Sequence, residues 1–283
     1  MRWEGRRQSS NIEDRRGYRV RRGLAGGGIG TLLLILVALY FGIDPTPLLQ
    51  GVQVESVPEA SRPGNQPRAD DQLAAFVSVV LADTEETWRA EFSAAGRTYR
   101  DPTLVLFTGA VQSACGMGSA AMGPFYCPGD EKIYIDLGFY RELRDRFQAP
   151  GDFAQAYVIA HEVGHHVQNL LGISGQVNTR RQRIGQAAGN QLSVMLELQA
   201  DCLAGVWGYR ADRLRGLLEQ GDIEEGLNAA SAIGDDRIQR KVQGQVVPDS
   251  FTHGSSAQRL KWFRRGLESG DLAVCDTFSA ASL

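Results

Sequence analysis

The chain contains the run His161-Glu162-Val163-Gly164-His165 in the middle of a long apolar stretch. Residues four apart on an α-helix lie one turn above each other, so His161 and His165 would share a face. Two imidazoles at this spacing can bind one Zn²⁺, and Glu162 can take a proton from a water molecule beside the metal. Of the 4 histidines in the chain, three lie within residues 161–166. The run therefore predicts a zinc site of a hydrolytic enzyme.

The flanking sequence predicts that this run is helical. Gly151-Asp152 offers an N-cap, and a carboxylate there also suits the positive end of the helix dipole. Gly172 is typical of a helix end. Between them, apolar residues recur at steps of three and four; they are Phe153, Ala156, Tyr157, Ala160, Val163, Gly164, Val167 and Leu171. A glycine inside a helix costs about 1 kcal/mol relative to alanine, so Gly164 indicates close packing at the motif.

A catalytic zinc takes three protein ligands and leaves one position for water. A third histidine six residues after the second is excluded, because Leu171 stands there and Gln168 replaces the accompanying glycine. We predict instead that Glu197, 32 residues after the second histidine, is the third ligand, in a helix from about 186 to 210. Asp201 shares its face and should accept the spare N–H of a ligating histidine. Apolar neighbours argue against a solvated face, since unpaired buried charge is costly.

These residues suggest a mechanism of amide hydrolysis. Zn²⁺ would activate water and polarise the scissile carbonyl, while Glu162 would act as the general base. The remaining histidine, His253, precedes a predicted helix from 256 to 267 and is our candidate for stabilising the oxyanion. Rival donors remain open; they are Tyr157, Tyr209 and Arg259. His166 points about 100° away from His165, so we expect it to be structural.

The first 69 residues predict where in the cell this site lies. The first 22 residues hold eight arginines against three acids, and residues 24–43 carry no charge. A run of that length can span a bilayer, and no signal-peptidase pattern follows it. We predict a cytoplasmic arginine-rich tail at 1–23, a transmembrane signal anchor at 24–43 and a proline-rich linker at 44–69. The net charge of −3 gives no signal for nucleic-acid binding.

Residues 70–283 should form one catalytic domain. A first helix is predicted at 71–95, and short strands at 103–107 and 132–136. Helices dominate the later sequence, so the expected fold class is α+β, mostly helical, with a small β-sheet. Residues 172–190 are either a mobile lid or a connector, and we favour a connector.

The chain has four cysteines, Cys115, Cys127, Cys202 and Cys275, and no C-x-x-C motif. Three pairings are possible. Because the predicted topology places the domain in an oxidising compartment, we favour Cys115–Cys127 and Cys202–Cys275 over four inert thiols. The first pair would close a loop beside a strand. An extended peptide could add to that strand, with its scissile bond over the zinc.

Several motifs together resemble the bacterial neutral zinc metallopeptidase family typified by the YpfJ-like proteins. They are Phe41-Gly42-Ile43-Asp44-Pro45, Ala114-Cys115-Gly116, Gly123-Pro124-Phe125-Tyr126-Cys127-Pro128, Ile133-Tyr134-Ile135-Asp136, the His161 motif, Glu197-Leu198-Gln199-Ala200-Asp201-Cys202 and Phe251-Thr252-His253-Gly254. The resemblance covers nearly the whole chain from the predicted anchor at 24–43 onward. It implies a zincin-like metallopeptidase fold with zinc on His161, His165 and Glu197, and Glu162 as the base. With the anchor, it implies a periplasmic or extracytoplasmic domain on the bacterial inner membrane.

Two classes of function remain open. The first is a membrane-anchored endopeptidase that acts on peptides or proteins outside the cytoplasm. The second is a non-catalytic, zinc-stabilised scaffold or binding protein; a third option is an amidase that acts on a cell-wall cross-link. The presence of Glu162 favours an enzyme, because a structural zinc site needs no general base and usually has four protein ligands.

Overall fold

The computed structural model describes residues 1–17, 71–280 and 283. Within these residues the main sheet has the strand order β1-β2-β6-β5. The strands are Ile12–Asp14 (β1), Thr103–Phe107 (β2), Lys132–Asp136 (β6) and Phe125–Cys127 (β5). β1 and β6 run parallel to β2, whereas β5 pairs antiparallel with β6 and lies at the edge. A separate antiparallel hairpin consists of β3 (Ala110–Ser113) and β4 (Gly116–Ser119).

The two faces of the sheet pack against different parts of the molecule. Side chains alternate along a strand, so Leu104, Leu106 and Ile133 face the large core that the helices share. Val105 and Tyr134 face the other way, into a small cluster under the β3–β4 hairpin. The strands predicted at 103–107 and 132–136 are confirmed, and both are covered on two sides.

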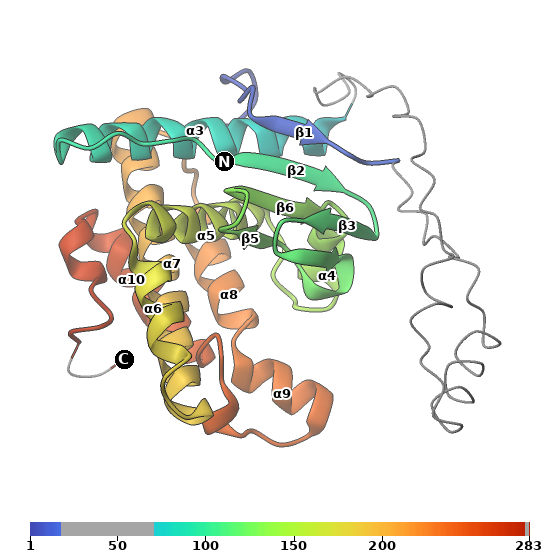
Figure 1. Ribbon diagram of the computed structural model, residues 1–283. Helices are drawn as coiled ribbons and strands as arrows, with labels where there is room; N and C mark the ends of the chain where they lie inside the picture. The colour runs from blue at the N-terminus through green and yellow to red at the C-terminus, as the bar shows by residue number, and fades with distance from the viewer. Residues whose placement is uncertain (18–70, 281–282) are drawn as a thin grey trace, which may run out of the picture.

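The helices form most of the domain (Figure 1). They are α3 (Gln72–Ala94), α4 (Phe139–Asp145), α5 (Asp152–Leu170), α6 (Ile173–Arg181), α7 (Gln186–Arg215), α8 (Asp222–Ala232), α9 (Asp235–Gln243) and α10 (Ser256–Ser269), with short 3₁₀ turns at η1 (Ala120–Met122), η2 (Pro248–Ser250) and η3 (Leu272–Cys275). The predicted helices at 71–95, around the His161 motif, at 186–210 and at 256–267 are confirmed as α3, α5, α7 and α10. The described part of the chain is a mostly helical α+β fold, as predicted.

Close helix contacts place α7 at the centre of the helical region. It packs against both α5 and α10. A Cβ added to Gly205 of α7 would lie 2.2 Å from the carbonyl oxygen of Phe263, and one added to Gly266 of α10 would lie 2.0 Å from that of Cys202. Only glycine fits these two positions, so the sequence fixes how near α7 and α10 can come.

Residues 1–17 belong to the domain. β1 pairs with β2, the backbone N–H of Ser9 donates to the carbonyl of Ser78, and the Met1 amino group lies 2.9 Å from the Asp152 carboxylate. Arg16 forms an ion pair with Asp71, the N-cap residue of α3. Residues of the domain therefore complete the strand and ion pairs of residues 1–17, although the sequence predicts that the domain begins at residue 70. The cytoplasmic location of the tail stays a prediction.

The predicted membrane anchor at 24–43 and the linker at 44–69 lie outside the described residues. Among the residues that the structure describes, none of the helices has both the length and the apolar character to span a bilayer. The stretch 172–190, predicted as a connector, holds the helix α6, which packs on α5 and α7.

Candidate metal centre

The metal-binding motif lies in the buried middle of α5, where this helix is in close contact with α7. His161 and Glu162 are buried, and His165 is half-buried. A Cβ on Gly164 would lie 3.0 Å from the carbonyl oxygen of Ala200 in α7. The missing side chain lets α7 come near enough for Glu197, less than one turn before Ala200, to face the histidines. The close packing predicted at Gly164 is thus present.

Three side chains converge from these two helices. His161 Nε2 lies 3.2 Å from Glu197 Oε2, and His165 Nε2 lies 3.4 Å from Glu197 Oε1. The ligand atoms of all three residues lie within 4.8 Å of one another. Two imidazole nitrogens and one carboxylate are a donor set that zinc takes in catalytic sites, with one position left for water. The structure therefore brings the three predicted ligands together.

Hydrogen bonds on the far side of each ring set which nitrogen faces the centre. His161 Nδ1 donates to Asp201 Oδ1 at 2.8 Å, and His165 Nδ1 donates to the amide oxygen of Gln168 at 2.9 Å. Both Nε2 atoms of the neutral rings are then acceptors aimed at Glu197, which also can only accept. Acceptors that face acceptors need a positive charge between them, which a proton or a metal ion can supply, so the three side chains fit a metal ion.

The charges around the centre lead to the same conclusion. Asp201 is fully buried and receives two hydrogen bonds of 2.9 Å from Arg259, together with one of 2.5 Å from the Tyr157 hydroxyl. The carboxylates of Glu162 and Glu197 interact with the same Arg259 guanidinium through their charge alone. Three carboxylates and one guanidinium leave two negative charges when the imidazoles are neutral. Burial alone lowers the pKa of His161, but Asp201 and Glu197 outweigh burial and raise it to about 10. The centre attracts positive charge, and a divalent cation would balance it.

Glu162 lies beside the ligands at the wall of a cavity of about 600 Å³. Burial raises the pKa of Glu162 above its ordinary value, against the attraction of His161 and His165. A carboxylate in such surroundings is a stronger base than one in water. The predicted general base is therefore both next to the metal set and open to a substrate. The apolar walls of the cavity include Phe125, Phe139, Phe147, Val158, Ile233 and Ile238.

His253 also lines this cavity, on the loop before α10. The first residue of α9, Asp235, holds the loop: its Oδ2 accepts the backbone N–H groups of Thr252 and His253, both at 2.7 Å, and that of Gly254 at 3.1 Å. Its Oδ1 lies 3.2 Å from His253 Nδ1, and this hydrogen bond raises the pKa of His253. With Nδ1 bound to Asp235, Nε2 is the nitrogen left for a substrate.

The rival donors differ in position. Tyr157 and Arg259 line the cavity, but both are bonded to Asp201. Tyr209 lies elsewhere on α7, with Arg213 over its ring, and is absent from the residues that line the cavity. Of the four candidates, His253 therefore has the donor group with the greatest freedom to contact a substrate.

Sequence analysis missed three residues that shape the site. Gln168 orients His165 and is itself held by its bond to the Leu196 carbonyl at 2.7 Å. Asp235 organises the His253 loop from 18 residues away. Tyr126 of β5 lies at the cavity and bonds to His166, which is buried and structural as predicted. Only Gln168 left a local signal, since it stands three residues after His165 on the same helix.

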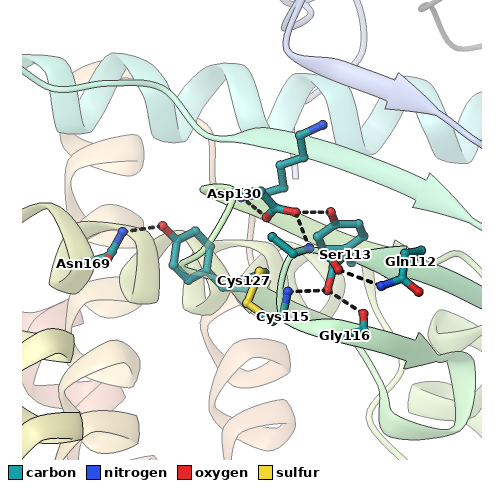
Figure 2. The surroundings of a disulfide bond; sticks show 11 residues. Gln112, Ser113, Cys115, Gly116, Cys127, Asp130 and Asn169 are labelled. Carbon is teal, nitrogen blue, oxygen red and sulfur yellow. Dashed lines mark hydrogen bonds between the residues drawn. A yellow bond between two sulfur atoms is a disulfide. The ribbon is translucent and has the colours of Figure 1, made fainter. Parts of the chain in front are cut away.

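Both predicted disulfides are present, Cys115–Cys127 and Cys202–Cys275. The first joins the turn of the β3–β4 hairpin to the end of β5 (Figure 2). In that turn Ser113 Oγ donates to the Gly116 carbonyl at 2.8 Å and accepts from the Cys115 N–H at 3.1 Å. The second links α7 to η3 near the C-terminus.

Comparison with known proteins agrees with this geometry. A family model described as "Putative neutral zinc metallopeptidase" matches residues 1–278. The protein YpfJ of Escherichia coli is 52% identical over 289 residues, which cover 98% of this chain and 99% of YpfJ. The protein Rv2575 of Mycobacterium tuberculosis is 42% identical over 259 residues, which cover 87% of this chain and 86% of that protein. No solved structure matches, so the zincin-like fold stays a prediction. The family match includes all three converging ligands, and the chain therefore belongs to the neutral zinc metallopeptidase family that includes YpfJ.

Proposed function

We propose that this protein is a zinc-dependent endopeptidase that hydrolyses peptide bonds outside the cytoplasm. The observation that supports this most strongly is the convergence of His161, His165 and Glu197 beside the buried base Glu162. A site built only to hold a structural metal needs neither an open position nor a base at a cavity wall.

The residues of the chain divide the work of hydrolysis between them. A zinc ion on the three ligands would supply Lewis acidity and lower the pKa of water. Glu162 would accept the proton of the attacking water on a carboxylate oxygen and pass it to the leaving amine. His253 Nε2–H would donate to the carbonyl oxygen of the scissile bond as negative charge develops there. Asp201 and Gln168 would hold the two imidazoles in the required tautomer.

A peptide is the substrate that suits the edge of the sheet. β5 pairs with β6 along one edge, and the order of the sheet leaves its other edge without a neighbouring strand among the described residues. Phe125 and Tyr126 of β5 line the same cavity as His161 and Glu162. An extended chain that adds to β5 would pass the metal set with its carbonyl groups in reach.

The two disulfides support a location outside the cytoplasm, because thiols stay reduced inside it. We propose that residues 1–17 and 71–283 act together in that compartment. The uncharged run at 24–43 is the segment that we propose for membrane attachment. A scaffold or a cell-wall amidase would have the same three metal ligands. The apolar lining of the cavity and the edge strand β5 at its wall favour a peptide substrate.

Replacing Glu162 by glutamine tests the mechanism. We expect the Glu162→Gln protein to lose roughly 10²- to 10⁴-fold in activity on an unfolded casein-like substrate, because the amide cannot accept the proton. Its zinc content, measured by atomic emission, should equal that of the wild type. A chelator should abolish wild-type activity, and added Zn²⁺ should restore it.

The matched control is Glu86→Gln, which makes the same chemical change on the exposed side of α3. It should leave activity unchanged. Full activity of the Glu162→Gln protein would rule out Glu162 as the general base. Full zinc content in both His161→Ala and Glu197→Ala would rule out the ligand set.

A further inference from the structure

The edge strand β5 is tied to the metal-binding helix by one side chain. Tyr126 lies at the centre of this three-residue strand and pairs with Ile133 of β6. Its hydroxyl reaches α5, where it lies 3.0 Å from His166 Nδ1. Asn169 Nδ2 donates to the same hydroxyl at 3.0 Å, a bond that Figure 2 shows. The two partners stand three residues apart on α5 and so share a face.

The direction of each hydrogen bond follows from the chemistry of the partners. His166 Nε2 lies 2.6 Å from the carbonyl oxygen of Arg100, which can only accept, so Nε2 carries the proton. In the neutral ring, Nδ1 is then an acceptor, and the Tyr126 hydroxyl donates to it. The hydroxyl oxygen also accepts from Asn169. Each of the three side chains thus has a defined role, which fixes the place of the hydroxyl.

Ring packing limits movement of His166 itself. Its side chain is fully buried, with the rings of Tyr99 and Tyr126 packed edge-on at centroid distances of 5.5 and 5.4 Å. A buried ring between two aromatic neighbours, with both nitrogens bonded, has one available orientation. Any shift of β5 relative to α5 must therefore break a hydrogen bond.

His166 follows the ligand His165 directly and points to the other side of the same helix. A rigid helix turn connects the two, so the distance between the strand edge and the metal ligands depends on this contact. We propose that Tyr126, His166 and Asn169 form a clamp that holds β5 at the register in which a bound peptide chain passes the metal. The clamp rests on the proposed peptidase function, and its members other than Tyr126 are positioning residues away from the cavity.

The test compares two tyrosines on either side of the His166 ring in the full-length protein. Tyr126→Phe removes the clamp hydroxyl, whereas Tyr99→Phe removes a buried hydroxyl that has no hydrogen-bond partner among the described residues. For a long extended peptide, Tyr126→Phe should raise KM about fivefold, the equivalent of one hydrogen bond, with kcat little changed. KM for a short blocked dipeptide that does not reach along β5 should stay the same. Tyr99→Phe should match the wild type on both.

Asn169→Ala tests the clamp from the helix, because Asn169 does not line the cavity. It should raise KM for the long peptide alone, and the double variant with Tyr126→Phe should be less than additive. Zinc content should be unchanged in every variant. A general loss of packing would instead affect the short and the long substrate equally.

A binding measurement separates failure of the clamp from failure of the peptidase. In a Glu162→Gln background, the dissociation constant of the long peptide should rise about fivefold on adding Tyr126→Phe. This readout needs no turnover, so it tests the clamp even if the wild type cleaves neither substrate. Equal KM and equal affinity in the Tyr126→Phe and Tyr99→Phe proteins would overturn the clamp, as would a rise in KM for both substrates.

Discussion

The carboxylate of Asp235 positions the His253 side chain, although the two residues do not lie on the same helix. It accepts three consecutive backbone N–H groups of the 252–254 loop and also bonds to the His253 ring. Backbone groups of a loop would otherwise turn to water, and the imidazole would turn with them. The orientation of His253 toward the cavity is therefore a property of Asp235 as much as of the loop.

Truncating these two residues should show that they act as a unit. His253→Ala should lower kcat about 10²-fold, as loss of an oxyanion donor does, and Asp235→Ala should lower it by a smaller factor. The double variant should be no slower than His253→Ala alone, since Asp235 acts through the imidazole. Single-turnover kinetics on a peptide substrate would measure this.

The neighbouring Asp236 provides the control. Its carboxylate accepts from the backbone N–H of Ser256 at 2.7 Å and, within the described part of the chain, forms no hydrogen bond with residues 252–254. Asp236→Ala should lower stability without a change in kcat for the folded fraction. Additive losses of kcat in the Asp235–His253 double variant would show instead that the two residues act independently.

At this scale the sequence is informative where partners lie on one helix. His161 with His165, and Glu197 with Asp201, are four residues apart, so helix geometry alone predicts that each pair shares a face. Asp235 and His253 are joined across a turn and a loop, and no periodic pattern links them. Tyr126 contacts His166 only because the edge strand β5 packs on α5, and this packing depends on the tertiary structure.

Between elements, glycine sets the spacing on which the metal centre depends. The contact of Gly164 with Ala200 joins α5 to α7, and those of Gly205 and Gly266 join α7 to α10. Main-chain atoms stand opposite each of these glycines. Backbone cannot rotate away as a side chain can, so a methyl group at such a place must push a whole helix.

Gly164→Ala should therefore weaken both folding and metal binding. The added Cβ would lie 3.0 Å from the Ala200 carbonyl oxygen and 3.1 Å from its Cα, so we expect a loss of about 1–3 kcal/mol from overpacking. Zinc affinity should also fall, because Glu197 lies less than one turn from the contact. Urea unfolding of the metal-free protein and competition with a zinc chelator would measure the two effects.

Gly175→Ala makes the same change on α6, where no atom of the residues that the structure describes lies within 4 Å of the new Cβ. Helix propensity alone should then make the protein more stable by up to about 1 kcal/mol. Equal behaviour of the two variants would mean that the contact at Gly164 is not tight.

Long periodic segments made the main elements predictable. The strands at β2 and β6 and the helices α3, α5, α7 and α10 follow from apolar spacing. β5 has three residues and β4 is half glycine, so neither shows a periodic apolar pattern, and α9 offers only two apolar residues, Ile238 and Val242. The edge strand that we propose for substrate binding thus belongs to the part of the fold that local pattern does not predict.

At the scale of the molecule, residues 1–17 and residues 71–280 pack together into one domain. β1 completes the sheet from residues that precede the uncharged run, and Ile12 is 3% exposed in the main core. Composition suggested a charged tail because the arginines dominate the first 22 residues. Several of these arginines have defined partners in the domain, such as Arg7 with Glu85, which only the tertiary structure shows.

Ile12→Ala tests this arrangement. Deleting most of a buried isoleucine should destabilise the domain by about 2 kcal/mol or more, because Ile12 packs into the shared core. The control Ser10→Ala, at an exposed position two residues earlier, should stay within about 0.5 kcal/mol of the wild type. Thermal and urea unfolding of the full chain would compare them. A tail independent of the domain would give the same unfolding curve for all three proteins.

The ion pair between Arg16 and Asp71 has a mechanical consequence. It brings Arg16, near the end of the first described segment, next to Asp71, where the second described segment begins. A force applied through the intervening residues would pull on both of these places at once and at one spot on the surface. The domain would then turn as a single rigid body about that spot, and neither its sheet nor helix α5 would be stretched.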